Sequence, residues 1–399
     1  MDEMKNKGLK LCLRLLSYVL VAALASAIAL YFFGGSSGQP VELTGKKSKL
    51  EELRDVILQQ YIGEADPLYM EDMAATAMVA ATGDRWSYYI PASDMQAHND
   101  QRNNSYVGIG VTIRVTEEGN GFTVLQVEPD GPAKNGGILP GDIIVAVDGQ
   151  SVAQLGVNEA ADMVSGPENT DVKITVERDG ENITFTLTRK RILVTVASGQ
   201  MVTDSVGYIK IANFDDRCCD ETVALIEELE QQGATAFVFD VRFNPGGYKH
   251  EMVNLLDYLL PKGILFRSED YRGRTWDDNS DASCREFPIA VLINSESYSA
   301  AEFFAAALEE YEYAVTVGQP TTGKGYFQNT IELSDGSAVN LSVGKYFTPK
   351  GVSLAEVGGL VPNVLVEVDE ETAAQIYSQL LPLEEDPQLQ AAIQALQGE

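Results

Sequence analysis

Histidine is scarce in this chain of 399 residues, where only His98 and His250 occur. Imidazole is the commonest metal ligand in proteins, so the sequence argues against a metal centre, and nothing in it indicates an organic cofactor. A Ser-His-Asp triad also needs a histidine. Neither histidine lies in a recognisable catalytic setting, although His250, which follows a Pro-Gly-Gly turn, stays open as the base of a small-ester hydrolase.

An excess of positive charge is also absent. The chain has 29 lysines and arginines against 59 acidic residues, which gives a formal net charge of −30. Affinity for nucleic acid comes mostly from neutralising phosphates, so we exclude nucleic acid as a partner. The acidic balance is typical of a solvated surface and says little about function.

Cysteine is limited to four residues, one near the N-terminus, an adjacent pair and Cys284. The pair, Cys218 and Cys219, fits no common zinc-binding spacing. A disulfide from Cys284 to one member of the pair stays open if the protein works in an oxidising compartment.

A long apolar run without charge covers residues 15–33, after a basic flank that ends at Arg14. As a helix it spans roughly 28 Å, about one hydrocarbon core. The run therefore predicts a single-pass membrane anchor, and the acidic composition together with the basic flank suits a bacterial cell membrane. The basic flank stays cytoplasmic and the chain after Gly34 lies outside. A cleaved signal peptide is the alternative, because Ala25-Ser-Ala27 looks like a cleavage site.

Glycine-punctuated strands begin near residue 105 and are followed by Gly137-Ile-Leu-Pro-Gly141-Asp-Ile-Ile-Val-Ala-Val-Asp-Gly149. Over roughly 90 residues this pattern resembles a PDZ domain. The resemblance implies that one loop holds the C-terminal carboxylate of a peptide added to a sheet edge. That loop consists of Val107, Gly108, Ile109, Gly110 and Val111. The alternative is that the glycines only serve a bulge.

Strands and helices alternate in the next part of the chain. Residues 206–211 and 236–242 read as strands, and residues 221–232 and 248–260 read as helices, which predicts an α/β layer with parallel pairing. A Pro245-Gly-Gly turn precedes the second helix, and its N–H groups can contribute to an oxyanion hole. An ordinary strand–helix turn is the alternative.

Ser299 lies where a buried strand, residues 289–293, gives way to a helix over residues 300–312. Unpaired N–H groups and the helix dipole favour negative charge there, which suits a nucleophile whose attack creates an oxyanion. The alternative is a capping box formed with Glu302.

Lysine can replace histidine as a base only if an apolar surround keeps it neutral. Lys324 precedes a predicted strand, residues 326–333, in which alternation places Lys324, Tyr326 and Gln328 on one face. Gln328 can then orient the amine. The alternative is that Lys324 is a solvated turn residue.

Two motifs, Asn294-Ser-Glu-Ser-Tyr-Ser299-Ala-Ala-Glu302 and Gly323-Lys-Gly-Tyr-Phe-Gln328, resemble the C-terminal processing peptidases. These are Ser–Lys peptidases with an embedded PDZ domain, and the resemblance covers nearly everything after residue 48. It implies these roles: nucleophile Ser299, general base Lys324, orienting residue Gln328, and oxyanion-hole donors Gly246 and Ala300. The family's alternating Ser-Ala-Ser-Ala-Ser run is interrupted by Tyr298 and Ala301.

We therefore predict an α/β multidomain protein with a crotonase-like peptidase core. Its expected segments are residues 1–34 (cytoplasmic tip and transmembrane helix), 35–48 (linker), 49–103 (helical scaffold), 104–190 (PDZ domain), 191–382 (peptidase core) and 383–399 (C-terminal helix). The predicted function is that of a membrane-anchored extracytoplasmic serine endopeptidase, without metal or cofactor, that cuts proteins with accessible C-termini. The resemblance also implies a homodimer through the terminal helices. The alternative is an inactive PDZ scaffold.

Overall fold

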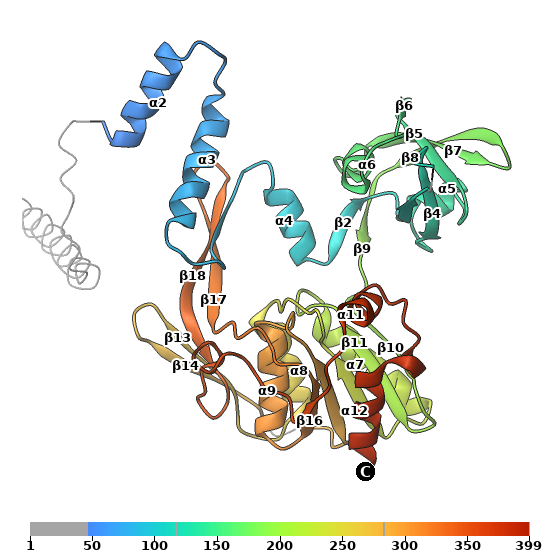
Figure 1. The fold of residues 1–399 in the computed structure, drawn as a ribbon, viewed down its shortest axis with the longest axis vertical. Coiled ribbons are helices and arrows are strands. Elements are labelled where there is room, and N and C mark those ends of the chain that lie inside the picture. Colours follow the sequence, from blue (N-terminus) through green and yellow to red (C-terminus); the bar gives the residue numbers. More distant parts are fainter. Residues whose placement is uncertain (1–46, 117, 282–283, 399) are drawn as a thin grey trace, which may run out of the picture. The chain divides into compact units, whose positions relative to one another are not determined.

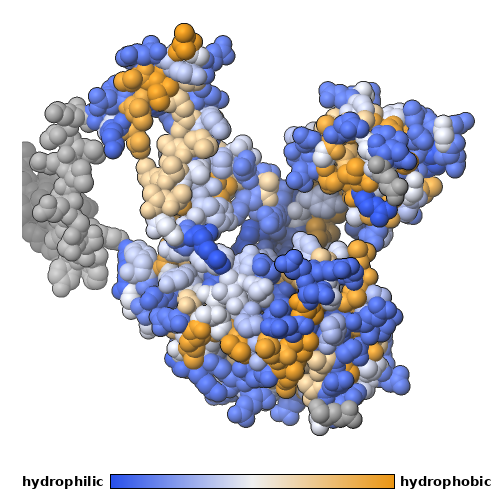
Figure 2. All heavy atoms as spheres, viewed as in Figure 1, coloured by the Kyte–Doolittle hydropathy of each residue, from blue (hydrophilic) through white to orange (hydrophobic). Residues whose placement is uncertain are grey.

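A computed structural model of the chain describes residues 47–116, 118–281 and 284–398. It divides into two compact units, the first ending at Glu71 and the second beginning at Asp72. Helix α2 (Lys49–Gln60) lies in the first unit and begins with a capping box between Ser48 and Glu51. Helix α3 (Pro67–Ala80) continues into the second unit. None of the side chains of α2 and α3 is buried, and Figure 2 shows apolar surface over these helices.

The predicted transmembrane helix is not supported. Residues 15–33 lie outside the described part of the chain, and within that part none of the helices is long and apolar enough to cross a membrane. Helices α3 and α7 (Cys218–Gln231), with 14 residues each, span only about 21 Å against a hydrocarbon core of roughly 30 Å. The fold class is therefore corrected: the described residues show an α/β multidomain protein and give no support for a transmembrane helix.

The PDZ-like region folds around one antiparallel sheet with the order β3-β4-β5-β7-β8. Its elements are β3 (Val111–Val115), β4 (Phe122–Val127), α5 (Pro132–Gly136), β5 (Ile143–Val147), β6 (Gln150–Ser151), α6 (Val157–Val164), β7 (Asp171–Arg178) and β8 (Glu181–Thr188). Alternating burial along β7 supplies one face of its core. The chain enters through α4 (Met95–Arg102) and β2 (Ser105–Gly108) and leaves through β9 (Lys190–Leu193), which pairs with β2.

The second core contains a six-stranded sheet with the order β10-β11-β12-β15-β16-β19. Its strands are β10 (Ala197–Met201), β11 (Val206–Ile211), β12 (Ala236–Asp240), β15 (Ile289–Ile293), β16 (Ala314–Gly318) and β19 (Val364–Leu365). All neighbours from β11 onward pair in parallel, and only β10 is antiparallel. Every residue of β12 and β15 is buried, as expected for strands covered on both faces.

Helices cover the two faces of this sheet (Figure 1). One hydrophobic cluster joins the sheet to α7, α8 (Lys249–Leu259) and α9 (Ala300–Glu310), and another joins it to α12 (Pro387–Gln397). The parallel strand–helix alternation predicted from the sequence is confirmed in the pairing of β11 with β12.

A second sheet of this unit contains β1 (Tyr88–Ile90), β18 (Ala338–Phe347), β13 (Ile264–Asp270) and β14 (Thr275–Asn279), with β17 (Tyr326–Glu332) also paired to β18. Short elements complete the described chain: α10 (Leu354–Val357), α11 (Glu370–Tyr377) and the 3-10 turn η1 (Leu383–Glu385). Cys218, Cys219 and Cys284 are free thiols, so the disulfide that the sequence left open does not form in this structure.

Candidate active site

Ser299 lies at the turn between β15 and α9 and is almost completely buried. Its φ of 58° and ψ of −127° are unusual for a residue with a side chain, and such strain costs of order 1–3 kcal/mol. The hydroxyl makes no capping hydrogen bond. The turn before it is fixed by Ser297, whose hydroxyl donates to the carbonyl of Val241 at 2.7 Å. The Glu302 half of the expected capping box is present, since its carboxylate accepts from the N–H of Ser299, but capping does not engage the hydroxyl of Ser299.

The glycine loop (residues 245–247) lies directly against this turn. A Cβ on Gly246 would be 2.7 Å from the Cβ of Ser299 and 2.8 Å from the nitrogen of Ala300, and the residue has a φ of 86°. Only glycine fits such a position. The structure thus brings the two predicted oxyanion donors together beside the serine. In this conformation the N–H of Gly246 donates to Oδ1 of Asn244 at 2.8 Å, so Asn244 must release it before it can bind an oxyanion.

The amine of Lys324 lies beside two aromatic rings. Its Nζ lies 4.6 Å from the ring centroid of Trp86 and 5.6 Å from that of Tyr298. Burial lowers the pKa of Lys324 to about 8, against the opposing effect of the nearby Glu302 carboxylate. Tyr298, which the sequence marked as a departure from the family motif, therefore forms part of the lysine's surroundings.

Glu302 was missed as a functional residue by sequence reasoning, which considered it only as a helix cap. Its side chain is fully buried. Oε1 accepts hydrogen bonds from the backbone N–H of Ser299 at 2.9 Å and of Lys324 at 2.7 Å. Oε2 accepts from the N–H of Gly323 at 2.9 Å and from the hydroxyl of Thr321 at 2.7 Å.

One carboxylate oxygen of Glu302 therefore bridges the backbones of the candidate nucleophile and the candidate base. Burial raises the pKa of Glu302, and the hydrogen bonds from its neighbours act in the opposite direction. The sequence did contain a signal for this role: Glu302 is the one charged residue among apolar neighbours at the start of its helix. A charge buried among apolar residues needs specific partners.

Gln328 is placed differently from the prediction. Its Nε2 donates to Oγ of Ser342 at 3.0 Å and to the carbonyl of Tyr326 at 3.1 Å, rather than to the amine of Lys324. Lys324 lies two residues before β17 begins at Tyr326, so strand alternation does not extend to it. The register shift between Phe327 and Gln328 skips Val343 of β18 and leaves Gln328 opposite Ser342.

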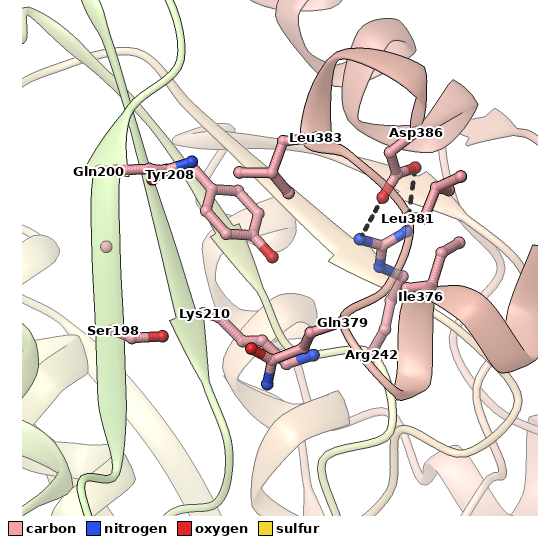
Figure 3. Close-up of a pocket in the computed structure, with 11 residues that line it drawn as sticks. Ser198, Gln200, Tyr208, Lys210, Arg242, Ile376, Gln379, Leu381, Leu383 and Asp386 are labelled. Carbon is pink, nitrogen blue, oxygen red and sulfur yellow. Dashed lines mark hydrogen bonds and ion pairs between the residues drawn. The ribbon is translucent and has the colours of Figure 1, made fainter. Parts of the chain in front are cut away.

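A buried ionic network surrounds Arg242, three residues before the glycine loop. The guanidinium of Arg242 donates to Asp240 and Asp386, each at 2.7 Å, and to Gln388 at 2.8 Å. Figure 3 shows Arg242 joined to Asp386 at the edge of a pocket that Tyr208 also lines. The pocket includes none of the candidate catalytic side chains, so it is separate from the active site.

The other residues singled out in the sequence have different surroundings. The ring of His250 stacks on Tyr248 with centroids 5.2 Å apart, and its Nε2 lies 3.5 Å from Glu251. In the PDZ loop, Ile109 is buried in the domain core, and its carbonyl accepts a hydrogen bond from Ala133 at 2.8 Å.

Two family models match the chain: peptidase family S41 over residues 205–366 and the PDZ domain over residues 123–178. The carboxy-terminal processing protease CtpA of Bacillus subtilis (strain 168) is 32% identical over 366 residues, which cover 89% of this chain and 78% of that protein. The carboxyl-terminal-processing protease of Synechocystis is 32% identical over 299 residues, 73% of this chain and 68% of that protein. A crystal structure of a putative S41 protease from Bacteroides fragilis shares the fold, with a TM-score of 0.52 and 17% identity over 87% of this chain and 97% of that one.

Proposed function

Because the chain belongs to peptidase family S41 and is a serine-type, carboxy-terminal processing peptidase, we propose that it cleaves proteins by a Ser299–Lys324 acyl-enzyme mechanism. The hydroxyl of Ser299 attacks the scissile carbonyl while neutral Lys324 takes its proton. Lys324 then gives that proton to the leaving amine. In the second half, Lys324 takes a proton from the water that attacks the acyl carbonyl. Lys324 then gives this proton to Oγ of Ser299 as the acyl C–O bond breaks, which releases the carboxylic acid product and restores the free serine and the neutral amine.

The observation that carries this proposal is the Glu302 bridge. A nucleophile and a base from distant parts of the chain react efficiently only when their geometry is fixed in advance. Glu302 holds the backbone of Ser299 and that of Lys324 on one oxygen, and burial keeps the pKa of Lys324 near 8. A substantial fraction of the amine is then neutral at pH 7–8.

The developing oxyanion is held, in this proposal, by the N–H groups of Ala300 and Gly246. Ala300 begins α9, where the helix dipole favours negative charge. Gly246 can take part once Asn244 turns away, which makes the present conformation a resting one. Gln328 keeps its predicted role only if its contact with Ser342 is exchanged for one with Lys324.

We also propose that the PDZ domain is coupled to the glycine loop through the hinge loop (residues 213–217). Arg217 donates to the carbonyls of Asn103 at 2.9 Å, Asn104 at 3.2 Å and Val194 at 2.6 Å, so it holds both ends of the connection to the PDZ domain. The side-chain amides of Asn104 and Asn213 exchange two further hydrogen bonds.

Phe214, in the same hinge loop, contacts the glycine loop on its other side. Its N–H donates to the carbonyl of Gly246, and its carbonyl accepts from Tyr248, both at 2.7 Å. Binding of a protein C-terminus by the PDZ domain can therefore change the position of Gly246 by moving the hinge loop. Such coupling fits a domain that selects substrates and gates the site.

The predicted domain boundaries, the homodimer and a place of action outside the bacterial cytoplasm remain parts of this proposal, without the membrane helix. The exposed apolar residues of α2 support the dimer, since large apolar surfaces on helices commonly mark interfaces. The relatives that support the location are bacterial carboxy-terminal processing proteases.

Cleavage of fluorescently labelled casein, an unfolded protein, tests the mechanism. We expect the unsubstituted chain to cleave casein and Ser299→Ala and Lys324→Ala to abolish cleavage, while His250→Ala retains it. Loss of activity in His250→Ala alone would instead indicate a Ser-His hydrolase. Inactivity of the unsubstituted, folded chain would favour the PDZ scaffold.

A further inference from the structure

The segment of residues 84–87, between α3 and β1, reaches the side chain of Lys324. The ring of Trp86 lies 4.6 Å from Nζ of Lys324, and the ring of Tyr298 lies 5.3 Å from the ring of Trp86. The amine thus contacts two aromatic rings. One belongs to the residue before the nucleophile, and the other comes from a region for which the sequence predicted only scaffold helices.

Hydrogen bonds fix this segment onto β18. The carboxylate of Asp84 accepts from the N–H of Trp86 at 3.0 Å and from the hydroxyl of Ser87 at 2.5 Å. Ser87 Oγ in turn accepts from the N–H of Ser342 at 2.9 Å. Ser342 is also the residue whose hydroxyl binds Gln328, so the segment and the predicted orienting residue share one attachment point.

Four charged groups act on Lys324 besides its burial. Burial lowers its pKa most, Glu302 and Asp84 raise it, and Arg102 and Arg85 lower it. Arg85 itself lies over the outer part of the aromatic pair, with its guanidinium 4.1 Å from the ring centroid of Trp86. Burial raises the pKa of Asp84, but hydrogen bonds from Ser342 and Ser87 outweigh burial and lower it, so Asp84 is ionised at neutral pH.

We propose that Trp86 and Asp84 are positioning residues for the peptidase reaction: Trp86 keeps water from the amine of Lys324, and Asp84 holds the segment in place and balances the local charge. The inference rests on the proposed role of Lys324 as the base. A cation over an aromatic face is also stabilised, which favours the ammonium form. Because burial is the largest influence on Lys324, we expect exclusion of water to dominate when the ring is removed.

The test is the pH dependence of kcat/KM for labelled casein, measured on the full chain from pH 6 to pH 10. In Trp86→Ala the amine becomes hydrated and its pKa rises, so the acid limb moves to higher pH by about one unit. Activity at pH 7 then falls about tenfold, in kcat rather than KM, and approaches that of the unsubstituted chain at high pH. Trp86→Phe restores most of the loss.

Asp84→Asn gives a shift of opposite sign, because its amide oxygen can still accept from the N–H of Trp86 and keep the segment in place, while the charge is lost. Loss of the negative charge that raises the pKa of Lys324 moves the acid limb to lower pH. Trp276→Ala, which replaces the half-exposed tryptophan of β14, is the matched control and leaves the profile unchanged.

Equal loss at all pH values in Trp86→Ala, or no shift in either variant, overturns the inference. A drop in thermal stability with an unmoved acid limb likewise assigns Trp86 a merely structural role. Failure of the proposed function is distinguishable, because it shows as activity in Lys324→Ala. If Lys324→Ala is inactive but the acid limb does not move in Trp86→Ala, only the inference drawn from residues 84–87 is refuted.

Discussion

Replacing Glu302 with glutamine leaves one side-chain oxygen in place of two. The two carboxylate oxygens now accept four hydrogen bonds, from the backbone N–H groups of Ser299, Gly323 and Lys324 and from the hydroxyl of Thr321. The amide nitrogen of glutamine can only donate. If it faces Thr321, that hydroxyl can rotate and accept, but the N–H of Gly323 then meets another donor. If it faces Ser299 and Lys324, two N–H groups lose their acceptor.

The first orientation of the amide is the less costly. It loses the bond to Gly323 and weakens the two bonds to the remaining oxygen, which is no longer charged. Hydrogen bonds to charged groups contribute about 1.5–3 kcal/mol each, so we expect the free energy of unfolding to fall by about 2–4 kcal/mol. Misplacement of Ser299 relative to Lys324 by about 1 Å adds a loss of roughly 10²-fold in kcat.

Urea unfolding followed by tryptophan fluorescence measures the stability, and initial rates of casein cleavage measure kcat and KM. Glu227→Gln, at an exposed glutamate of α7, is the control and changes neither. Unaltered kcat in a Glu302→Gln variant would refute the claim that this carboxylate sets the geometry of the nucleophile and the base.

Three further outcomes follow from the same contacts. Casein cleavage rises as the pH increases through about 8, because Lys324 acts as a base only when deprotonated, and a pH–rate profile without this limb argues against the lysine. Asp386→Ala removes one of the two carboxylates around buried Arg242 and lowers the free energy of unfolding by about 3 kcal/mol in urea titrations; an unchanged midpoint contradicts that role of the pair. Arg217→Ala lowers kcat/KM for casein several-fold without changing the melting temperature by more than a few degrees, whereas unchanged kinetics rule out coupling through the hinge loop.

The elements next to the serine could be predicted closely from the sequence. The predicted strand over residues 289–293 coincides with β15, since a short apolar run between turn residues is typical of a buried strand. The helix after Ser299 begins as predicted but ends at Glu310 instead of residue 312. Glu312 has a φ of 61°, and a residue in that left-handed conformation cannot continue a helix.

Contacts between distant segments were beyond the reach of local patterns. Asp84 and Trp86 lie more than two hundred positions before Lys324, and β18, which attaches them, pairs with strands from three parts of the chain. Aromatic and acidic residues are common in turns and short loops. Their relation to a lysine exists only after β1 has paired with β18.

Gln328 shows how a local rule fails at a functional site. Alternation predicts which side chains share a face only within a regular strand, and Lys324 lies before β17 begins at Tyr326. The register shift skips Val343 of β18, which leaves Gln328 opposite Ser342, and the amide of Gln328 donates to that hydroxyl instead of reaching the lysine. Ser342 is attached through Ser87 to the segment that carries Trp86. A movement of β18 that returned Gln328 to the lysine would therefore also move the tryptophan, so the orientation of the base and its shielding from water are expected to change together.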